Sequence, residues 1–406
     1  MTNLKKYAEL VVRLGVNIQK DQTLHINAPL EAAEFVRAVT TRAYKAGAKH
    51  VYVNYIDEEL ARIKFEEAPD EAFLEFPSWK VQGFEQMVEE GAAFLSIHAE
   101  NPELLKGIDP TRIAAAQKTK GQAMKKFSEA IQTDTVSWCV VSVPTKAWAK
   151  HVFPNVSEEE QVDCLWEAIY QTLRVEQDDI VKAWQNHADT LDQKASYLNK
   201  KKYKTIHYRA PGTDLKVDLH ERHQWLSAGS TDKRGVTFIA NLPSEEVFTT
   251  PLKTGANGYV TSTKPLNYGG TLIENFTLTF ENGKIVDAKA EKGLETLQRL
   301  IETDEGSHFL GEIALVPHDS PISNANLIFF NTLFDENASN HLAIGSAYAT
   351  CLEDGQNMNR EELDAHGAND SLIHVDFMIG SREMDIDGIT HDGKIEPIFR
   401  KGNWAF

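Results

Sequence analysis

The spacing of apolar residues changes near residue 195, and this change limits what the chain can fold into. Before residue 195, strand-like and helical segments alternate, and the first helix is expected over residues 4–14. The expected strands cover residues 23–27, 50–55, 92–97 and 136–143. A long helical stretch at residues 110–131 separates the last two. Such alternation is typical of an open α/β sheet.

Beyond a second helical block at residues 157–199, short strands dominate the pattern. They are expected at residues 203–208, 215–219, 236–240, 272–280 and 285–290. The pair Asn282-Gly283 lies between two of them and predicts a type I′ hairpin turn. We therefore predict two domains. Residues 1–195 form an α/β domain with an open sheet, and residues 196–406 form an α+β domain rich in antiparallel strands.

The charge of the chain excludes some classes of function. Sixty acidic residues against 42 Lys and Arg give a formal charge of −18, which disfavours a general nucleic-acid binder. No stretch approaches the roughly 18 uncharged residues of a membrane span. The three cysteines are widely spaced, as expected in a reducing compartment. We expect a soluble cytoplasmic protein that binds neither nucleic acid nor membranes.

The segment at residues 373–379 is an apolar strand that contains two potential metal ligands. His374 and Asp376 are two residues apart, so both side chains point to the same face of the strand. A nitrogen and a carboxylate presented side by side suit a divalent metal. A simple hydrogen-bonded His-Asp pair is the alternative interpretation.

A second segment, residues 329–348, runs from an apolar stretch through a polar loop into another apolar stretch. It contains Glu336, His341 and Tyr348. If His341 begins a helix, Tyr348 lies seven residues later on the same side, where its phenol can reach a metal or an oxyanion. The alternative is a capped loop followed by a tyrosine packed in the core.

Two further sites place acids in apolar surroundings. Glu312 lies within an apolar run at residues 311–316, and Glu245 and Glu246 precede another. Adjacent residues of an extended segment face opposite sides, so only one of the pair can enter a common site. Taken alone, each acid is weak evidence for a site, because a single glutamate in a strand more often lies at a solvated edge.

Together these residues form a set of oxygen donors with two histidines, which suits two divalent ions that share a carboxylate. Two-metal hydrolases use such sites to activate water and to polarise a carbonyl. The His-Glu-x-x-His motif of mononuclear zinc proteases does not occur in the chain. A phosphoesterase and a non-catalytic peptide-binding or metal-binding protein are the alternatives.

Five segments in combination resemble one known family. They are YAEL at 7–10, NLPSEEVFT at 241–249, GEIALV at 311–316, FDENASNH at 334–341 and IHVD at 373–376. With these, the chain closely resembles the aminopeptidase T / aminopeptidase S (PepS) family of thermophilic-type dinuclear metallo-aminopeptidases, over nearly its whole length.

The resemblance implies hydrolysis of the N-terminal residue from peptides that have a free N-terminus, by a water activated between two divalent ions in the C-terminal domain. It also implies a homodimer. Glu312 is the expected bridging and catalytic carboxylate, and Tyr348 is the expected catalytic phenol beside the metals. The expected ions are zinc, cobalt, manganese or magnesium. The metal ligands implied are Glu246, Glu312, Glu336, His341, His374 and Asp376.

Overall fold

The structure, a computed structural model, describes residues 2–99, 101, 103–268 and 271–406. The chain forms two compact units. Unit 1 combines Met1–Asn186 with Gly229–Pro243, and unit 2 combines His187–Ala228 with Ser244–Phe406. The division into domains at residues 195 and 196 stays a prediction.

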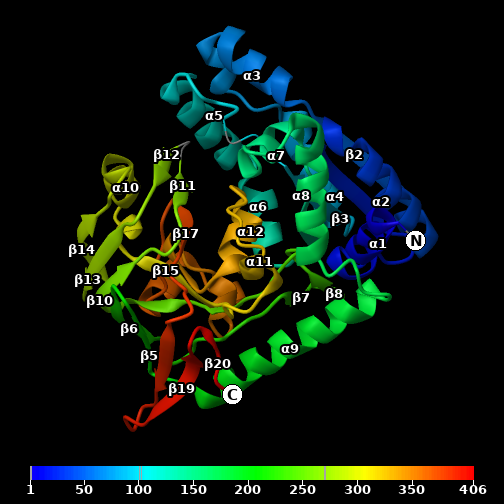
Figure 1. The fold of residues 1–406 in the computed structure, drawn as a ribbon. Coiled ribbons are helices and arrows are strands. Elements are labelled where there is room, and N and C mark those ends of the chain that lie inside the picture. The colour runs from blue at the N-terminus through cyan, green and yellow to red at the C-terminus, as the bar shows by residue number, and fades with distance from the viewer. Residues whose placement is uncertain (1, 100, 102, 269–270) are drawn as a thin grey trace. The chain divides into compact units, whose positions relative to one another are not determined.

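Unit 1 is built around a parallel sheet of four strands in the order β2-β1-β3-β4. Parallel strands need crossover connections, and the alternating pattern of the sequence supplies them as helices. The sheet confirms the predicted open α/β architecture of this half (Figure 1). The strands are β1 Thr23–Pro29, β2 His50–Ile56, β3 Ala93–His98 and β4 Trp138–Ser142.

Helices alternate with the strands of unit 1 as predicted, but two of the expected helical stretches are interrupted. The block expected over residues 157–199 is divided into α8, Glu158–Thr172, and α9, Ile180–Lys201. The helical stretch expected over residues 110–131 is interrupted at Met124, which separates α5 from α6. Helix α2 ends at Gly47, whose φ of +106° suits a residue without a Cβ. The helices are α1 Asn3–Leu10, α2 Ala33–Ala46, α3 Glu58–Glu67, α4 Ser78–Glu89, α5 Pro110–Ala123, α6 Lys125–Gln132, α7 Lys146–Val152 and α8 Glu158–Thr172.

Two further segments complete unit 1. Strands β7, Gly229–Thr231, and β8, Thr237–Ile239, form a short antiparallel ribbon. Helix α9, Ile180–Lys201, begins in unit 1 and continues into unit 2. No helix in the described part of the chain combines the length and the apolar character needed to cross a membrane.

Unit 2 contains an antiparallel sheet of eight strands in the order β14-β13-β10-β6-β5-β18-β19-β20. This sheet confirms the predicted change to antiparallel strands in the second half of the chain. The predicted hairpin joins β13 to β14, with Asn282 at φ +50° and Gly283 at φ +83°. The strands are β5 Thr205–Ala210, β6 Thr213–Leu219, β10 Pro251–Thr261, β13 Thr277–Glu281, β14 Lys284–Lys289, β18 Asp385–Ile389, β19 Ile395–Arg400 and β20 Asn403–Trp404.

A smaller antiparallel sheet in unit 2 has the order β17-β16-β15-β9. Its two central strands, β15 Leu310–Leu315 and β16 His341–Gly345, are buried at every residue. Their flanking strands are β9 Val247–Thr249 and β17 His374–Met378. Further elements of unit 2 include β11 Leu266–Tyr268, β12 Thr271–Ile273, α10 Leu294–Ile301, α11 Pro321–Asn324, α12 Thr332–Asp335, the 3-10 helix Glu336–Ala338 and α13 Arg360–Ala365.

Candidate metal centre

The smaller sheet of unit 2 brings together acids and histidines that are far apart in the sequence. Glu246 immediately precedes β9, Glu312 lies within β15, and His341 is the first residue of β16. His374 and Asp376 lie on β17, where Asp376 pairs with Ala343 of β16. Four neighbouring strands therefore each present at least one possible ligand.

A bulge in β15 re-aims the central acid. The register between β15 and β16 shifts between Leu310 and Glu312, so Gly311 is an extra residue without a partner. A Cβ at Gly311 would lie 2.3 Å from the backbone oxygen of Ser346, so only glycine fits. Bulges change the direction of the side chains beside them. The bulge therefore helps to direct the side chain of Glu312 towards both histidines.

The donor atoms fall into two groups that share Glu312. Within each group, one donor atom from every residue lies within 4.8 Å of the others. In the first group, Nε2 of His341 is 3.2 Å from Oε2 of Glu246 and 3.6 Å from Oε1 of Glu312. In the second, Nε2 of His374 is 3.5 Å from Oε2 of Glu312 and 3.5 Å from Oδ1 of Asp376. The two oxygens of Glu312 thus face different histidines.

Backbone carbonyls fix the orientation of both imidazole rings. Nδ1 of His341 lies 3.0 Å from the oxygen of Ser339, and Nδ1 of His374 lies 2.7 Å from the oxygen of Ser346. A carbonyl oxygen can only accept a hydrogen bond, so Nδ1 is the donor in both rings. Nε2 is left to face the carboxylates. Metal-binding histidines are commonly oriented in this way.

The electrostatics of the cluster favour a bound cation. Burial disfavours the charged form of Glu312, but hydrogen bonds from His341 and His374 outweigh burial and lower the pKa of its carboxyl to about 2. Burial also lowers the pKa of each histidine, and the neighbouring carboxylates reverse this and raise it well above the ordinary value. The carboxylate Oδ1 of Asp376 is buried, and the donor that faces it is Nε2 of His374 at 3.5 Å. Within the two donor groups three carboxyl groups face two histidines, a set of side chains that suits a bound cation.

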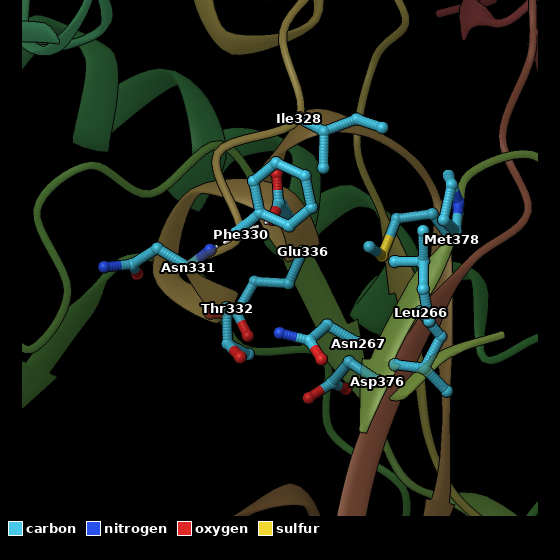
Figure 2. A pocket seen from close by; sticks show the side chains of 12 residues that line it. Leu266, Asn267, Ile328, Phe330, Asn331, Thr332, Glu336, Asp376 and Met378 are labelled. Atoms are coloured by element: carbon cyan, nitrogen blue, oxygen red, sulfur yellow. Dashed lines mark hydrogen bonds between the residues drawn. The ribbon is translucent and has the colours of Figure 1, made fainter. Parts of the chain in front are cut away.

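Glu336 lies beside these groups without belonging to either. Burial, together with the carboxylates of Asp376 and Glu246, raises the pKa of Glu336 well above its ordinary value. Glu336 and Asp376 line the same cavity (Figure 2). Positive charge placed between these two acids would relieve their repulsion.

The side chains of the adjacent acids Glu245 and Glu246 point to opposite sides, as expected for an extended segment. Glu246 faces His341, whereas Oε2 of Glu245 lies 3.4 Å from Nε2 of His187. Both acids are buried, with 2% and 7% of their surfaces exposed. Glu245 therefore offers a buried acid of the same type that is not in either donor group.

Tyr348 reaches the cluster by a route that the sequence did not indicate. The helix considered after His341 is wrong, because hydrogen bonds to β15 and β17 make this segment a strand. Tyr348 follows that strand, and its ring packs against the ring of His374 at a centroid distance of 4.8 Å. Burial and the nearby carboxylates raise the pKa of its phenol well above 10, so the hydroxyl keeps its proton and can donate it in a hydrogen bond.

The groups that support the ligands were not among the residues predicted from the sequence. The carbonyls of Ser339 and Ser346 belong to the backbone, so no side-chain pattern could identify them. Asn337 is fully buried, and its Oδ1 accepts a hydrogen bond from the backbone nitrogen of Glu245 at 2.7 Å. A run of polar residues that is buried between apolar stretches was the available signal for Asn337.

Known proteins resemble this chain over its whole length. The family model described as thermophilic metalloprotease (M29) matches residues 1–404. Aminopeptidase AmpS of Bacillus subtilis is 57% identical over 99% of this chain and 98% of its own length, and aminopeptidase PepS of Streptococcus thermophilus is 47% identical over the same shares. The wild-type AmpT structure from Thermus thermophilus superposes with a TM-score of 0.94 at 43% identity, covering 100% of this chain and 99% of that one. The chain therefore belongs to the M29 family of thermophilic metalloproteases.

Proposed function

We propose that the protein is an aminopeptidase that removes single residues from the N-terminus of peptides, at a site for two divalent ions. The observation that carries the proposal is that Glu312 belongs to both donor groups. One of its carboxylate oxygens faces His341 and the other faces His374. Relatives that are similar over the whole chain bear the name aminopeptidase, which supports the choice of substrate.

Each ion would have its own ligands and one in common. Glu246 and His341 would bind the first ion, His374 and Asp376 the second, and Glu312 both. Glu336 would complete the set from the short helix beside Asp376. Donors of this mixed type accept zinc, cobalt, manganese or magnesium.

The side chains divide the remaining work of peptide hydrolysis. When bound, the two ions lower the pKa of a water and polarise the carbonyl of the first peptide bond. Tyr348, whose ring packs beside the ring of His374, would donate a hydrogen bond from its phenol to the oxygen that becomes negative during attack. A carboxylate of the site that does not bind both ions would carry the proton to the leaving amine. The acids of the site also attract the positively charged N-terminus of the substrate, which favours exopeptidase action.

The two alternative functions fit the site less well. A phosphoesterase usually adds a lysine or arginine that binds phosphate. Neither donor group contains a lysine or an arginine. Among the described residues, the ion pairs formed by the donor-group side chains join only acids and histidines of these groups. A protein that only binds metal or peptide would show no turnover, so a chelator experiment separates it from an enzyme.

The decisive experiment combines metal content with activity in three variants. Wild-type protein should bind two ions, lose turnover of a leucyl chromophore substrate with chelator and regain it with added ion. Glu312→Gln should weaken both ions because it removes the shared ligand, whereas Glu246→Gln should weaken one. Glu245→Gln is the matched control and should keep both ions.

Two outcomes would contradict the proposal. Full turnover by metal-free protein would exclude metal-dependent hydrolysis. Loss of only one ion in Glu312→Gln, with the other retained at wild-type affinity, would exclude a shared carboxylate.

We further propose that the chain forms homodimers and acts in the cytoplasm. Strand β2 lies at the edge of its sheet and exposes large apolar side chains, including 54% of Tyr52 and 49% of Ile56. Exposed apolar patches of this kind often mark contacts between proteins. The three cysteines are free thiols, which fits a reducing compartment. Sedimentation of wild-type protein and of Tyr52→Glu tests the dimer, which should dissociate in the variant.

A further inference from the structure

A small cavity in unit 2 adjoins the proposed metal site. Its volume is about 70 Å³, and two of its lining residues are Glu336 and Asp376. The side chains of Leu266, Ile328 and Met378 line it as well (Figure 2). The cavity thus has acidic groups that belong to the proposed site and apolar groups that do not.

Phe330 lines the cavity in a backbone conformation that is unusual for its type. Its φ is +54°, a region that bulky residues rarely adopt. Such conformations persist only where the surrounding structure imposes them, and they occur often at functional sites.

A buried carboxylate imposes this conformation. Oδ1 of Asp335 accepts a hydrogen bond from the backbone nitrogen of Phe329 at 2.8 Å, and Oδ2 accepts one from that of Asn331 at 3.1 Å. The residues on both sides of Phe330 are therefore tied to one side chain, of which only 8% is exposed. Asp335 acts here as a positioning residue, and Phe330 is fixed at the cavity.

We propose that this cavity receives the side chain of the substrate's N-terminal residue and that Phe330 limits the size of side chain it accepts. The assignment rests on the proposed aminopeptidase function. The α-amine and the side chain of that residue leave the same carbon. A substrate whose amine is drawn to the acids of the site therefore places its side chain in the space beside them.

The size of the cavity suits a substrate side chain of medium volume. One buried water needs roughly 10–15 Å³ of such space, so the cavity has room for about five waters. This is close to the volume of one medium-sized side chain. Its described lining contains no lysine or arginine. Met378 is a flexible residue that adapts to different apolar shapes. A leucyl substrate should fit, whereas the ring of a phenylalanyl substrate meets Phe330.

The test measures kcat/KM for leucyl and phenylalanyl chromophore substrates with metal-loaded wild type, Phe330→Leu and Phe330→Ala. The wild type should prefer the leucyl substrate. The ratio of phenylalanyl to leucyl kcat/KM should rise stepwise as residue 330 becomes smaller, by about tenfold or more in Phe330→Ala. Ile395→Ala is the control, because Ile395 is 63% exposed on β19 and does not line the cavity.

The outcomes separate the two proposals. An unchanged ratio in both Phe330 variants, with metal content equal to that of the wild type, overturns the cavity assignment and leaves aminopeptidase function standing. A wild-type protein that cleaves neither substrate in the presence of metal overturns the proposed function and the cavity assignment with it. The Phe330→Leu variant preserves an apolar side chain, so it decides the matter even if Phe330→Ala does not fold.

Discussion

Gly311→Ala should damage the metal site without removing any ligand. Its Cβ would lie 2.3 Å from the backbone oxygen of Ser346 and 2.4 Å from that of Gly345. Both oxygens would have to move away from the added Cβ by about 1 Å to reach the 3.4 Å of ordinary contact. The oxygen of Ser346 is also the acceptor for Nδ1 of His374. One added methyl group therefore acts on both the bulge beside Glu312 and the orientation of His374.

The expected magnitudes follow from these contacts. Overpacking a dense site costs about 1–3 kcal/mol. Unit 2 contains roughly 200 residues, and a domain of this size loses about 2–4 °C in melting temperature per kcal/mol, so we expect a decrease of about 2–12 °C. Loss of the carbonyl that orients a metal-binding histidine typically lowers metal affinity or activity by about 10–100-fold.

Thermal unfolding, metal titration and turnover of a leucyl substrate should be measured on the same preparations. Gly121→Ala is the control, since Gly121 lies within α5 and its Cβ would meet nothing within 4 Å. That variant should be neutral or slightly more stable. If Gly311→Ala binds metal and turns over substrate like the wild type, the bulge and the Ser346 carbonyl do not orient the site, and our reasoning fails.

Three other predictions concern the chemistry and the stability of the protein. Tyr348→Phe should lower kcat by about 100-fold with KM and metal content unchanged, as steady-state kinetics and metal analysis would show; equal kcat would exclude the phenol as a donor. Chelation should lower the melting temperature, because an ion present at 100 times its Kd contributes about 2.7 kcal/mol; identical melting curves would argue against bound ions. Burial lowers the pKa of His25 to about 4 from 6.5, so the unfolded chain binds its proton first as the pH falls. The stability that depends on neutral His25 is therefore complete above pH 6.5 and decreases by about 3 kcal/mol towards pH 4, and denaturant unfolding of His25→Leu should lack this decrease.

The sequence predicted the main classes of element because those patterns are local. Alternating helices and strands indicated the parallel sheet of unit 1, and Asn282-Gly283 indicated the hairpin between β13 and β14. The side-chain period of two also placed His374 and Asp376 on one face. It could not show that a hydrogen-bonded ladder would make a strand of the segment before Tyr348, where a helix was considered.

What the tertiary structure alone decided is which distant residues meet. Glu246 and Asp376 are 130 positions apart, and the pairing of β9, β15, β16 and β17 brings their strands into one sheet. Register between such strands depends on hydrogen bonds to non-neighbouring segments, and a bulge at Gly311 shifts it by one residue. The carbonyls that orient the histidines and the left-handed conformation of Phe330 arise in the same way. The sequence by itself determined the donor types and the faces on which they lie, because these depend on residues two or three positions apart. Only the folded chain determined the distances between donors and the shape of the cavity beside them, because these depend on contacts across the whole unit.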